Sequence, residues 1–153
     1  MSARHRVYLA SSWRNQHQPA IVDVLRTAGH EVYDFRNPGP GERGFAWSEI
    51  SPAWQAWTAD AQIGALDHPT AQHGLALDFG GMRWCSALVM LQPCGRSAAL
   101  ELGWAIGAGK RTAVLMRDGQ EPELMIRLAD YLTTSVDKLL EWLDATARGY
   151  EAA

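Results

Sequence analysis

Hydrophobic positions along the chain alternate between short continuous runs and longer stretches with helical spacing. Continuous runs rich in Val, Leu, Ile and Tyr predict buried strands. They occur at residues 6–11, 32–35, 86–94 and 112–116, with a short strand or turn at 131–135. Small polar residues follow the run at 6–11 and Gly95 follows the run at 86–94, so we expect these two strands to end in turns.

Stretches with apolar residues three and four apart separate these strands and predict helices. The first begins near Pro19, which suits the first turn of a helix, and Gly29 suits its end. A further helix at 96–108 ends at Gly109, and Ser135 is a suitable cap for a closing helix at 135–149. Other helices are predicted at 51–57, opened by a Ser cap, at 58–68, opened by a Thr cap, and at 69–85 and 121–130.

The order of these elements predicts the fold. A strand, a helix and a second strand within about 30 residues indicate a parallel sheet with a right-handed crossover. The continued alternation predicts a single α/β domain over residues 1–153, a three-layer flavodoxin-like (Rossmann-like) fold with about five parallel strands in the order 2-1-3-4-5. Ligands bind at the carboxyl ends of such strands, so we expect a site at the loops following residues 6–10 and 86–92.

Composition narrows the class of function. The chain has 153 residues, 47% hydrophobic and 20% charged, with a formal net charge of -3, which argues against a duplex nucleic-acid binder. No apolar stretch is long enough to span a membrane. Cys85 and Cys94 form neither a C-x-x-C pair nor a disulfide framework, so we expect a reducing compartment and a cytoplasmic protein.

Residues 36–57 form a long segment rich in Gly, Pro and Trp. Long loops inside compact domains are usually functional or mobile. Trp47, Trp54 and Trp57 crowd this segment together with Phe45. Such aromatic side chains can stack on a base, or they can pack a lid onto the core, and the sequence leaves both interpretations open.

Glu101 is the most unusual polar residue, since it stands alone among small and apolar residues in "CGRSAALELGWAIGAGKR". It is either a surface acid near a helix N-terminus, where the helix dipole favours it, or a partly buried carboxylate facing a cleft. Gly95, Arg96 and Ser97 precede it, and Ser97 shares its helix face. They form either an anion-binding turn or an ordinary turn with a helix cap.

Two further groups are candidates for chemistry. Ser11, Ser12 and Arg14 follow the first strand directly and could bind phosphate, or could form a solvated loop that caps the next helix. Asp78 lies in an apolar helix and is either a functional acid or an exposed or capping residue. No His, Cys and Asp set has metal-ligand spacing, and neither a Walker loop nor a G-x-G-x-x-G motif is present, so no metal or cofactor is implied.

Three stretches together, "VYLASSWRN", "ALDFGGM" and "CGRSAALELGWAIGAGK", resemble the nucleoside 2-deoxyribosyltransferase superfamily, including its nucleotide N-hydrolases and N-glycosidases, over roughly residues 6–116. The resemblance implies that Glu101 is the nucleophile, that Tyr8 positions it and that Asp78 is the acid. It assigns Ser11, Ser12 and Arg14 to the loop of the hydrolase branch. The chain departs from the transferases at Gly95, where they carry an acid, and at Cys85-Ser86, where many members have Ala-Asp.

These observations predict an enzyme that cleaves the N-glycosidic bond of a nucleotide or nucleoside, by hydrolysis or by transfer to another base. Ser12, Arg14, Gly95, Arg96 and Ser97 would hold phosphate, and Trp47 would stack on the base. The resemblance implies a homo-oligomer, a dimer or larger, since family sites borrow residues across an interface. Two alternatives stay open: a non-catalytic nucleotide-binding sensor, and a glycohydrolase acting on NAD or a cyclic nucleotide.

Overall fold

A computed structural model describes residues 4–150, which form two compact units. The first unit comprises residues 4–34 and 84–150, and the second comprises residues 35–83, inserted into the sequence of the first. No helix within residues 4–150 has the length and apolar character needed to cross a bilayer. The organisation as a single domain stays a prediction.

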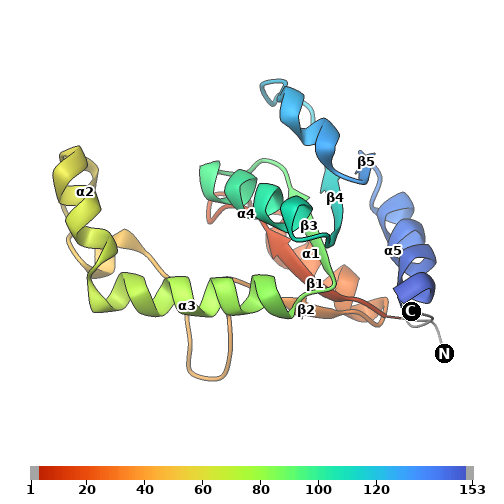
Figure 1. Cartoon of the computed structure of the whole chain (residues 1–153), viewed down its shortest axis with the longest axis horizontal. Coiled ribbons are helices and arrows are strands. Elements are labelled where there is room, and N and C mark those ends of the chain that lie inside the picture. Colours follow the sequence, from red (N-terminus) through yellow and green to blue (C-terminus); the bar gives the residue numbers. More distant parts are fainter. Residues whose placement is uncertain (1–3, 151–153) are drawn as a thin grey trace. The chain divides into compact units, whose positions relative to one another are not determined.

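The first unit is built on a five-stranded parallel sheet (Figure 1). Its strands are β1 (Arg6–Ala10), β2 (Glu31–Tyr33), β3 (Ala87–Leu91), β4 (Arg111–Leu115) and β5 (Tyr131–Thr133). They are ordered β2-β1-β3-β4-β5, which confirms the predicted order. β1 therefore lies between β2 and β3, and the chain reverses its direction of travel across the sheet there. That reversal opens the carboxyl ends of β1 and β3 to a ligand.

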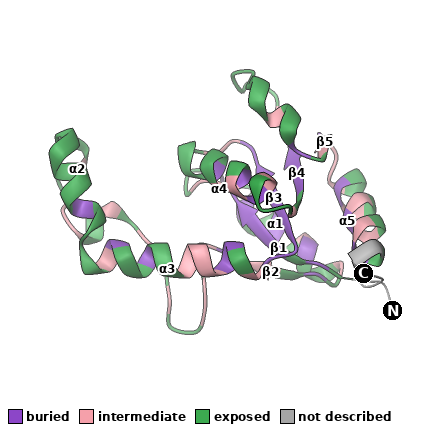
Figure 2. Cartoon of the chain, in the orientation of Figure 1, coloured by how far each residue is buried: buried purple, intermediate pink, exposed green. Residues whose placement is uncertain are grey.

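Helices cover both faces of this sheet, as the three-layer prediction requires. α1 (Gln18–Thr27) and α5 (Val136–Tyr150) pack on one face, where Val7 and Leu9 of β1 meet Leu25 and Leu139 in the core. The alternate β1 residues, Tyr8 and Ala10, point to the other face, which α4 (Arg96–Gly107) covers with Ala98, Leu102 and Ala105. Figure 2 shows β1, β3 and β4 largely buried and the outward helix faces exposed, whereas β2 at the sheet edge is exposed or half-buried.

Helix ends in the first unit follow the sequence signals. Gly109 has a φ of 72°, and its N–H donates to Ile106 O at 3.1 Å, while Lys110 N–H donates to Ala105 O at 3.0 Å. This pair of hydrogen bonds is the Schellman motif, which ends α4 where Gly109 predicted. At the start of α5, Lys138 N–H donates to Ser135 Oγ at 3.3 Å, so Ser135 is the cap.

Two predicted elements of the first unit differ from the structure. The helix expected at 121–130 is only a 3₁₀ helix, η3 (Leu124–Leu128), because its apolar side chains are exposed and no packed face stabilises a longer helix. β2 ends at Tyr33 rather than at Phe35. The next residue, Asp34, leaves the ladder, and its carboxylate accepts a hydrogen bond from Gln18 Nε2 at 2.8 Å.

The second unit consists of α2 (Ala59–Leu66), α3 (Pro69–Trp84, whose last residue belongs to the first unit) and two 3₁₀ turns, η1 (Trp47–Glu49) and η2 (Trp54–Ala56). Thr58 caps α2 as predicted, accepting from Ala61 N–H at 3.2 Å. The helix predicted at 51–57 is wrong: η2 is a single turn, and Ser51 Oγ accepts only from Ala53 N–H. Phe45 packs on Gly74 of α3, where any Cβ would lie 2.8 Å from Phe45 Cβ.

A buried polar cluster occupies the amino ends of β1 and β3, opposite to the expected site. His5 is 1% exposed; its Nδ1 lies 2.8 Å from Ser86 Oγ and its Nε2 lies 3.0 Å from Thr146 Oγ1. The backbone N–H of His5 donates to Nδ1 of His30 at 3.1 Å. Burial above all, and then the charges of His30 and Arg111, lower the pKa of His5 to about 4, although Asp144 acts in the opposite direction.

This cluster predicts a loss of stability in mild acid. The folded-state pKa of His5 lies below its value in the unfolded chain, so the unfolded chain binds more protons between about pH 6.5 and pH 4. The His5 contribution is therefore complete above pH 6.5 and is lost as the pH falls to 4, by up to about 3 kcal/mol. Urea unfolding at several pH values measures it. His5→Gln should flatten the profile between pH 6.5 and 4, whereas exposed His17→Gln should leave it unchanged.

Candidate active site

The loops that follow β1 and β3 are joined by hydrogen bonds from two side chains. Ser11 Oγ donates to the carbonyl oxygen of Leu91, the last residue of β3, at 3.0 Å. Asn15 Nδ2 donates to Ser11 Oγ and to the carbonyl oxygen of Pro93, each at 3.1 Å. Asn15 is 1% exposed. The amide group of Asn15 therefore joins the β1 loop to the β3 loop in the interior of the first unit.

The same residue shapes the entry into α1. Asn15 Oδ1 accepts from His17 N–H at 2.9 Å, and Asn15 N–H donates to Ser12 O at 3.0 Å. Ser12 Oγ accepts from Arg14 N–H at 3.2 Å, and the Arg14 side chain is exposed. Sequence analysis missed Asn15. The feature of the sequence that could have indicated Asn15 is an amide four residues after Ser11, because short amide side chains often hydrogen-bond to nearby backbone in loops.

The end of β3 is also joined to the end of β4. Gln92 N–H donates to Leu115 O at 3.0 Å, and Gln92 Oε1 accepts from Arg117 N–H at 3.2 Å. The Gln92–Pro93 peptide bond is cis. Side-chain and backbone hydrogen bonds thus connect the carboxyl ends of three neighbouring strands, β1, β3 and β4, at one edge of the sheet.

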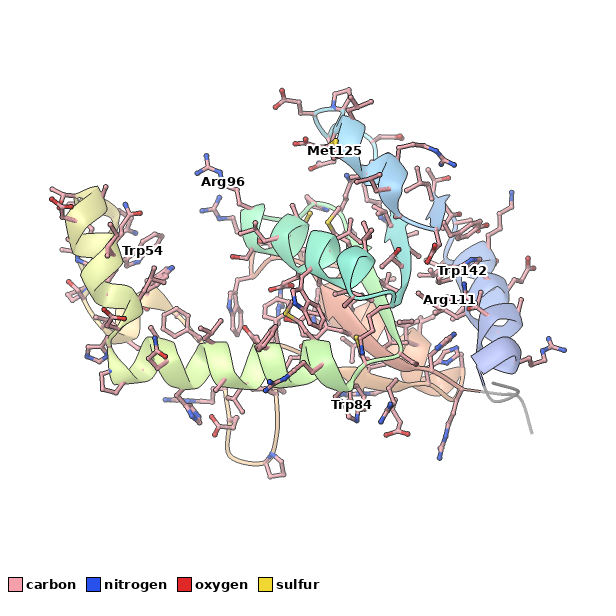
Figure 3. All side chains as sticks on the ribbon, viewed as in Figure 1. Trp54, Trp84, Arg96, Arg111, Met125 and Trp142 are labelled. Carbon is pink, nitrogen blue, oxygen red and sulfur yellow. The ribbon has the colours of Figure 1, made fainter. Side chains whose placement is uncertain are left out.

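α4 begins directly after this edge. Gly95 precedes the helix in an extended conformation, with φ −91° and ψ −176°, and has no side chain with which to cap it. Arg96 and Ser97 lie in the exposed first turn (Figure 3). A helix start with exposed amides, a guanidinium and a hydroxyl has the chemistry of an anion-binding turn. Gly95, Arg96 and Ser97 are thus adjacent and accessible.

Glu101 lies in the second turn of α4 and is half-buried. It borders the buried helix face, since Ala98 and Ala105, three residues before and four after it, pack on the sheet. Burial raises the pKa of the Cys94 thiol, and the negative charge of Glu101 raises it further. The Glu101 carboxylate therefore acts electrostatically on the β3–α4 loop, beside the joined strand ends.

Tyr8 is 1% exposed and occupies the sheet face that α4 covers. Its ring stacks on Tyr33 of β2 with centroids 5.0 Å apart and an interplanar angle of 10°. This stack fixes the ring plane of Tyr8 between two neighbouring strands. Its expected role in positioning Glu101 stays a prediction.

The other two candidates belong to the second unit. Asp78 is half-buried on α3. Trp47 begins η1 and is half-buried, with the rings of Phe45 and Trp57 set edge-to-face against it. Within residues 4–150 no group of three His, Cys, Asp or Glu side chains comes together in a way that could hold a metal ion.

Two solved structures are similar to this chain over almost its whole length. A 2-deoxyribosyltransferase of Bacillus psychrosaccharolyticus has a TM-score of 0.64 at 20% identity, covering 95% of this chain and 96% of that one. A CMP N-glycosidase of Clostridium botulinum has a TM-score of 0.50 at 18% identity, covering 92% and 98%. No protein-family model and no curated protein sequence matches the chain. At these identities the likeness establishes the fold, and the fold implied by the sequence resemblance is confirmed.

The proximity of Glu101 to Cys94 predicts a change in thiol reactivity. Glu101→Gln removes a negative charge, so the pKa of Cys94 should fall and more thiolate should be present at pH 8. Iodoacetamide should then alkylate Cys94 faster than in the unmodified protein, as followed by peptide mass spectrometry. Glu141→Gln on the exposed face of α5 is the matched control, and buried Cys85 provides an internal reference. An unchanged pH profile of Cys94 alkylation would contradict this placement of the carboxylate.

The buried Asn15 amide predicts a stability effect. Asn15→Ala leaves the Pro93 carbonyl and the His17 N–H without this partner, which should lower the free energy of unfolding by about 2 kcal/mol. Exposed Gln16→Ala, in the same loop, should change it by less than about 0.5 kcal/mol. Equal urea midpoints for the two variants would show that the joined loops do not depend on Asn15.

Proposed function

We propose that this chain cleaves the N-glycosidic bond of a nucleotide or nucleoside, with Glu101 as the nucleophile and water as the preferred acceptor. The observation that carries the proposal is the place of Glu101: a half-buried carboxylate in the second turn of α4, beside the joined ends of β1 and β3. The fold adds support, since two of the structures that share it are named as a 2-deoxyribosyltransferase and a CMP N-glycosidase.

The chemistry follows from the residue types. The carboxylate of Glu101 would attack C1′ of the sugar, forming a C1′–O ester bond as the C1′–N bond breaks and its electron pair leaves with the base. The departing base takes a proton, for which we propose Asp78 as the donor, on the sequence resemblance. Water then attacks C1′ and gives a proton to the Asp78 carboxylate as the C1′–O bond to Glu101 breaks, which releases the sugar and restores the Glu101 carboxylate and the Asp78 acid. Transfer to a second base would follow the same course with that base replacing water.

A 5′-phosphate is the group we propose for the exposed turn at the start of α4. Gly95, Arg96 and Ser97 supply helix-start amides, a guanidinium and a hydroxyl, and Arg14 supplies a second exposed guanidinium. Ser11 Oγ donates to Leu91 O and accepts from Asn15 Nδ2, so we assign Ser11 to holding the loop. Ser12 Oγ accepts from Arg14 N–H, and a hydroxyl group that accepts a hydrogen bond can also donate one. We therefore assign Ser12, Arg14, Arg96 and Ser97 to contacting phosphate.

We also retain the proposal of a homo-oligomer, which rests on the resemblance. Leu124, Met125 and Leu128 of η3 are 85%, 65% and 58% exposed, and a cluster of exposed apolar side chains is a feature of surfaces that associate. Sedimentation velocity of the intact protein measures the assembly directly.

Replacement of Glu101 tests the reaction. Deoxynucleoside and nucleoside monophosphates, and the free nucleosides, are incubated with the protein, with and without an acceptor base, and released base is separated by chromatography. Glu101→Ala and Glu101→Gln should each lower turnover by at least about 10³-fold, as loss of a nucleophile does. Glu141→Gln on α5 should retain full activity. Peptide mapping of a slow reaction should find the sugar on Glu101.

The same assay separates the alternatives. Full turnover in Glu101→Gln would exclude it as the nucleophile. Tight nucleotide binding with no base released from any substrate would favour the sensor, and release of nicotinamide from NAD would favour the glycohydrolase.

A further inference from the structure

The second unit carries a pocket that none of the steps above uses. Its volume is about 250 Å³, and it opens between η1, η2 and α2. We call it the tryptophan pocket; it is lined by Trp47, Trp54, Gln55, Trp57, Gln62 and Leu66. Figure 3 shows Trp54 beside α2. Every lining residue belongs to residues 35–83, so the pocket is complete within one unit.

The indole rings form a corner rather than a stack. Trp47 and Trp57 have centroids 5.7 Å apart and an interplanar angle of 81°. The ring of Phe45 is also set edge-to-face against Trp47, with centroids 4.7 Å apart and an interplanar angle of 86°. Two rings at right angles can receive a flat ring that stacks on one indole and directs its edge toward the other. The Trp47–Trp57 geometry therefore suits a planar guest.

The polar part of the lining indicates the chemical class of that guest. None of the six lining residues is charged, so the pocket offers no counter-charge to a phosphate or a metal ion. Gln55 and Gln62 are exposed amides, and Gln62 Nε2 lies 3.5 Å from the backbone carbonyl oxygen of Trp57, which ties its amide to the backbone of a lining residue. An amide presents a donor and an acceptor side by side, matching the paired donor and acceptor on the edge of a nucleobase.

Size and packing point in the same direction. Aromatic side chains that served only to pack a lid would be expected to fill the space between them, because protein interiors are close-packed. Here three indoles leave an open pocket. Its volume lies below the range of roughly 300–1,000 Å³ that drug-sized ligands occupy, which suits a single heterocycle better than a whole nucleotide.

We propose that the tryptophan pocket binds a neutral, flat heterocycle, namely the nucleobase, by stacking on an indole and hydrogen-bonding to Gln55 or Gln62. The identification of the heterocycle as a nucleobase rests on the proposed function, but the geometry of the pocket does not. A quaternary ammonium ion, the other guest of aromatic cages, fits less well because it has no donor or acceptor to match the amides of Gln55 and Gln62.

Equilibrium binding of free bases tests this without any turnover. Adenine, hypoxanthine, cytosine and uracil are titrated into Glu101→Gln protein by calorimetry, with tetramethylammonium as the competing chemistry. At least one base should bind. Adding Trp57→Leu should then lower the affinity for that base at least about five-fold, the loss expected for one base–aromatic stack. Adding Trp57→Phe instead should leave the affinity within about two-fold of its value in the Glu101→Gln protein. Leu75→Ala is the matched control, an exposed apolar residue of α3 outside the pocket.

Gln55→Leu and Gln62→Leu test the hydrogen bonds separately, and at least one should change which base binds best. The proposal is overturned if no base binds at millimolar concentration, if Trp57→Leu leaves base affinity unchanged, or if only tetramethylammonium binds. It is also overturned if Trp57→Leu changes the sedimentation coefficient and leaves base binding intact, since the pocket would then serve association between copies. Base binding in a protein that releases no base would contradict the proposed function alone.

Discussion

The hydrogen bonds of the Asn15 amide are the interaction on which the candidate site depends. In a parallel sheet, β1 and β3 are far apart in sequence and are brought together only by pairing, so their loops would otherwise be independent. Asn15 Nδ2 contacts Ser11 in one loop and the Pro93 carbonyl in the other, from a buried position where water cannot substitute for those partners. The turn that begins α4 comes directly after Pro93, so the same hydrogen bonds fix the start of α4 and thereby the position of Glu101.

α4 is connected to β3 near both of its ends. Near its start, Glu101 borders the strand ends and acts electrostatically on Cys94. At its other end, the Gly109 turn directs Lys110 back to the sheet, where Nζ donates to the carbonyl oxygen of Cys85 at 2.7 Å, ahead of β3. The helix is therefore fixed to β3 at both of its ends. Gly109 and Lys110 therefore help to fix the position of α4, and with it the position of Glu101, from the far end of the helix.

The two ends of the sheet carry polar groups of different purpose. At the amino ends, the backbone N–H and both ring nitrogens of His5 are hydrogen-bonded to His30, Ser86 and Thr146, and burial favours the neutral imidazole. At the carboxyl ends, Arg14, Arg96 and Ser97 are exposed and face solvent. A polar group that is paired inside the protein contributes to a unique packing, whereas one directed outward is available to a ligand. The carboxyl ends therefore combine a half-buried carboxylate, Glu101, with exposed guanidinium groups and an exposed hydroxyl group.

The sequence determined the strands, most helix ends, the parallel order and the unusual status of Glu101, because these follow from local periodicity, turn residues and the handedness of βαβ units. It could not distinguish the 3₁₀ turns at 54–56 and 124–128 from helices, since helical spacing alone does not reveal whether a packed face exists to stabilise an α-helix. Nor could it identify Asn15, because its partner Pro93 is close in space but 78 residues away in the sequence. Burial, pairing and the corner of indoles at Trp47 and Trp57 depend on distances between separated segments, and those distances exist only once the chain has folded.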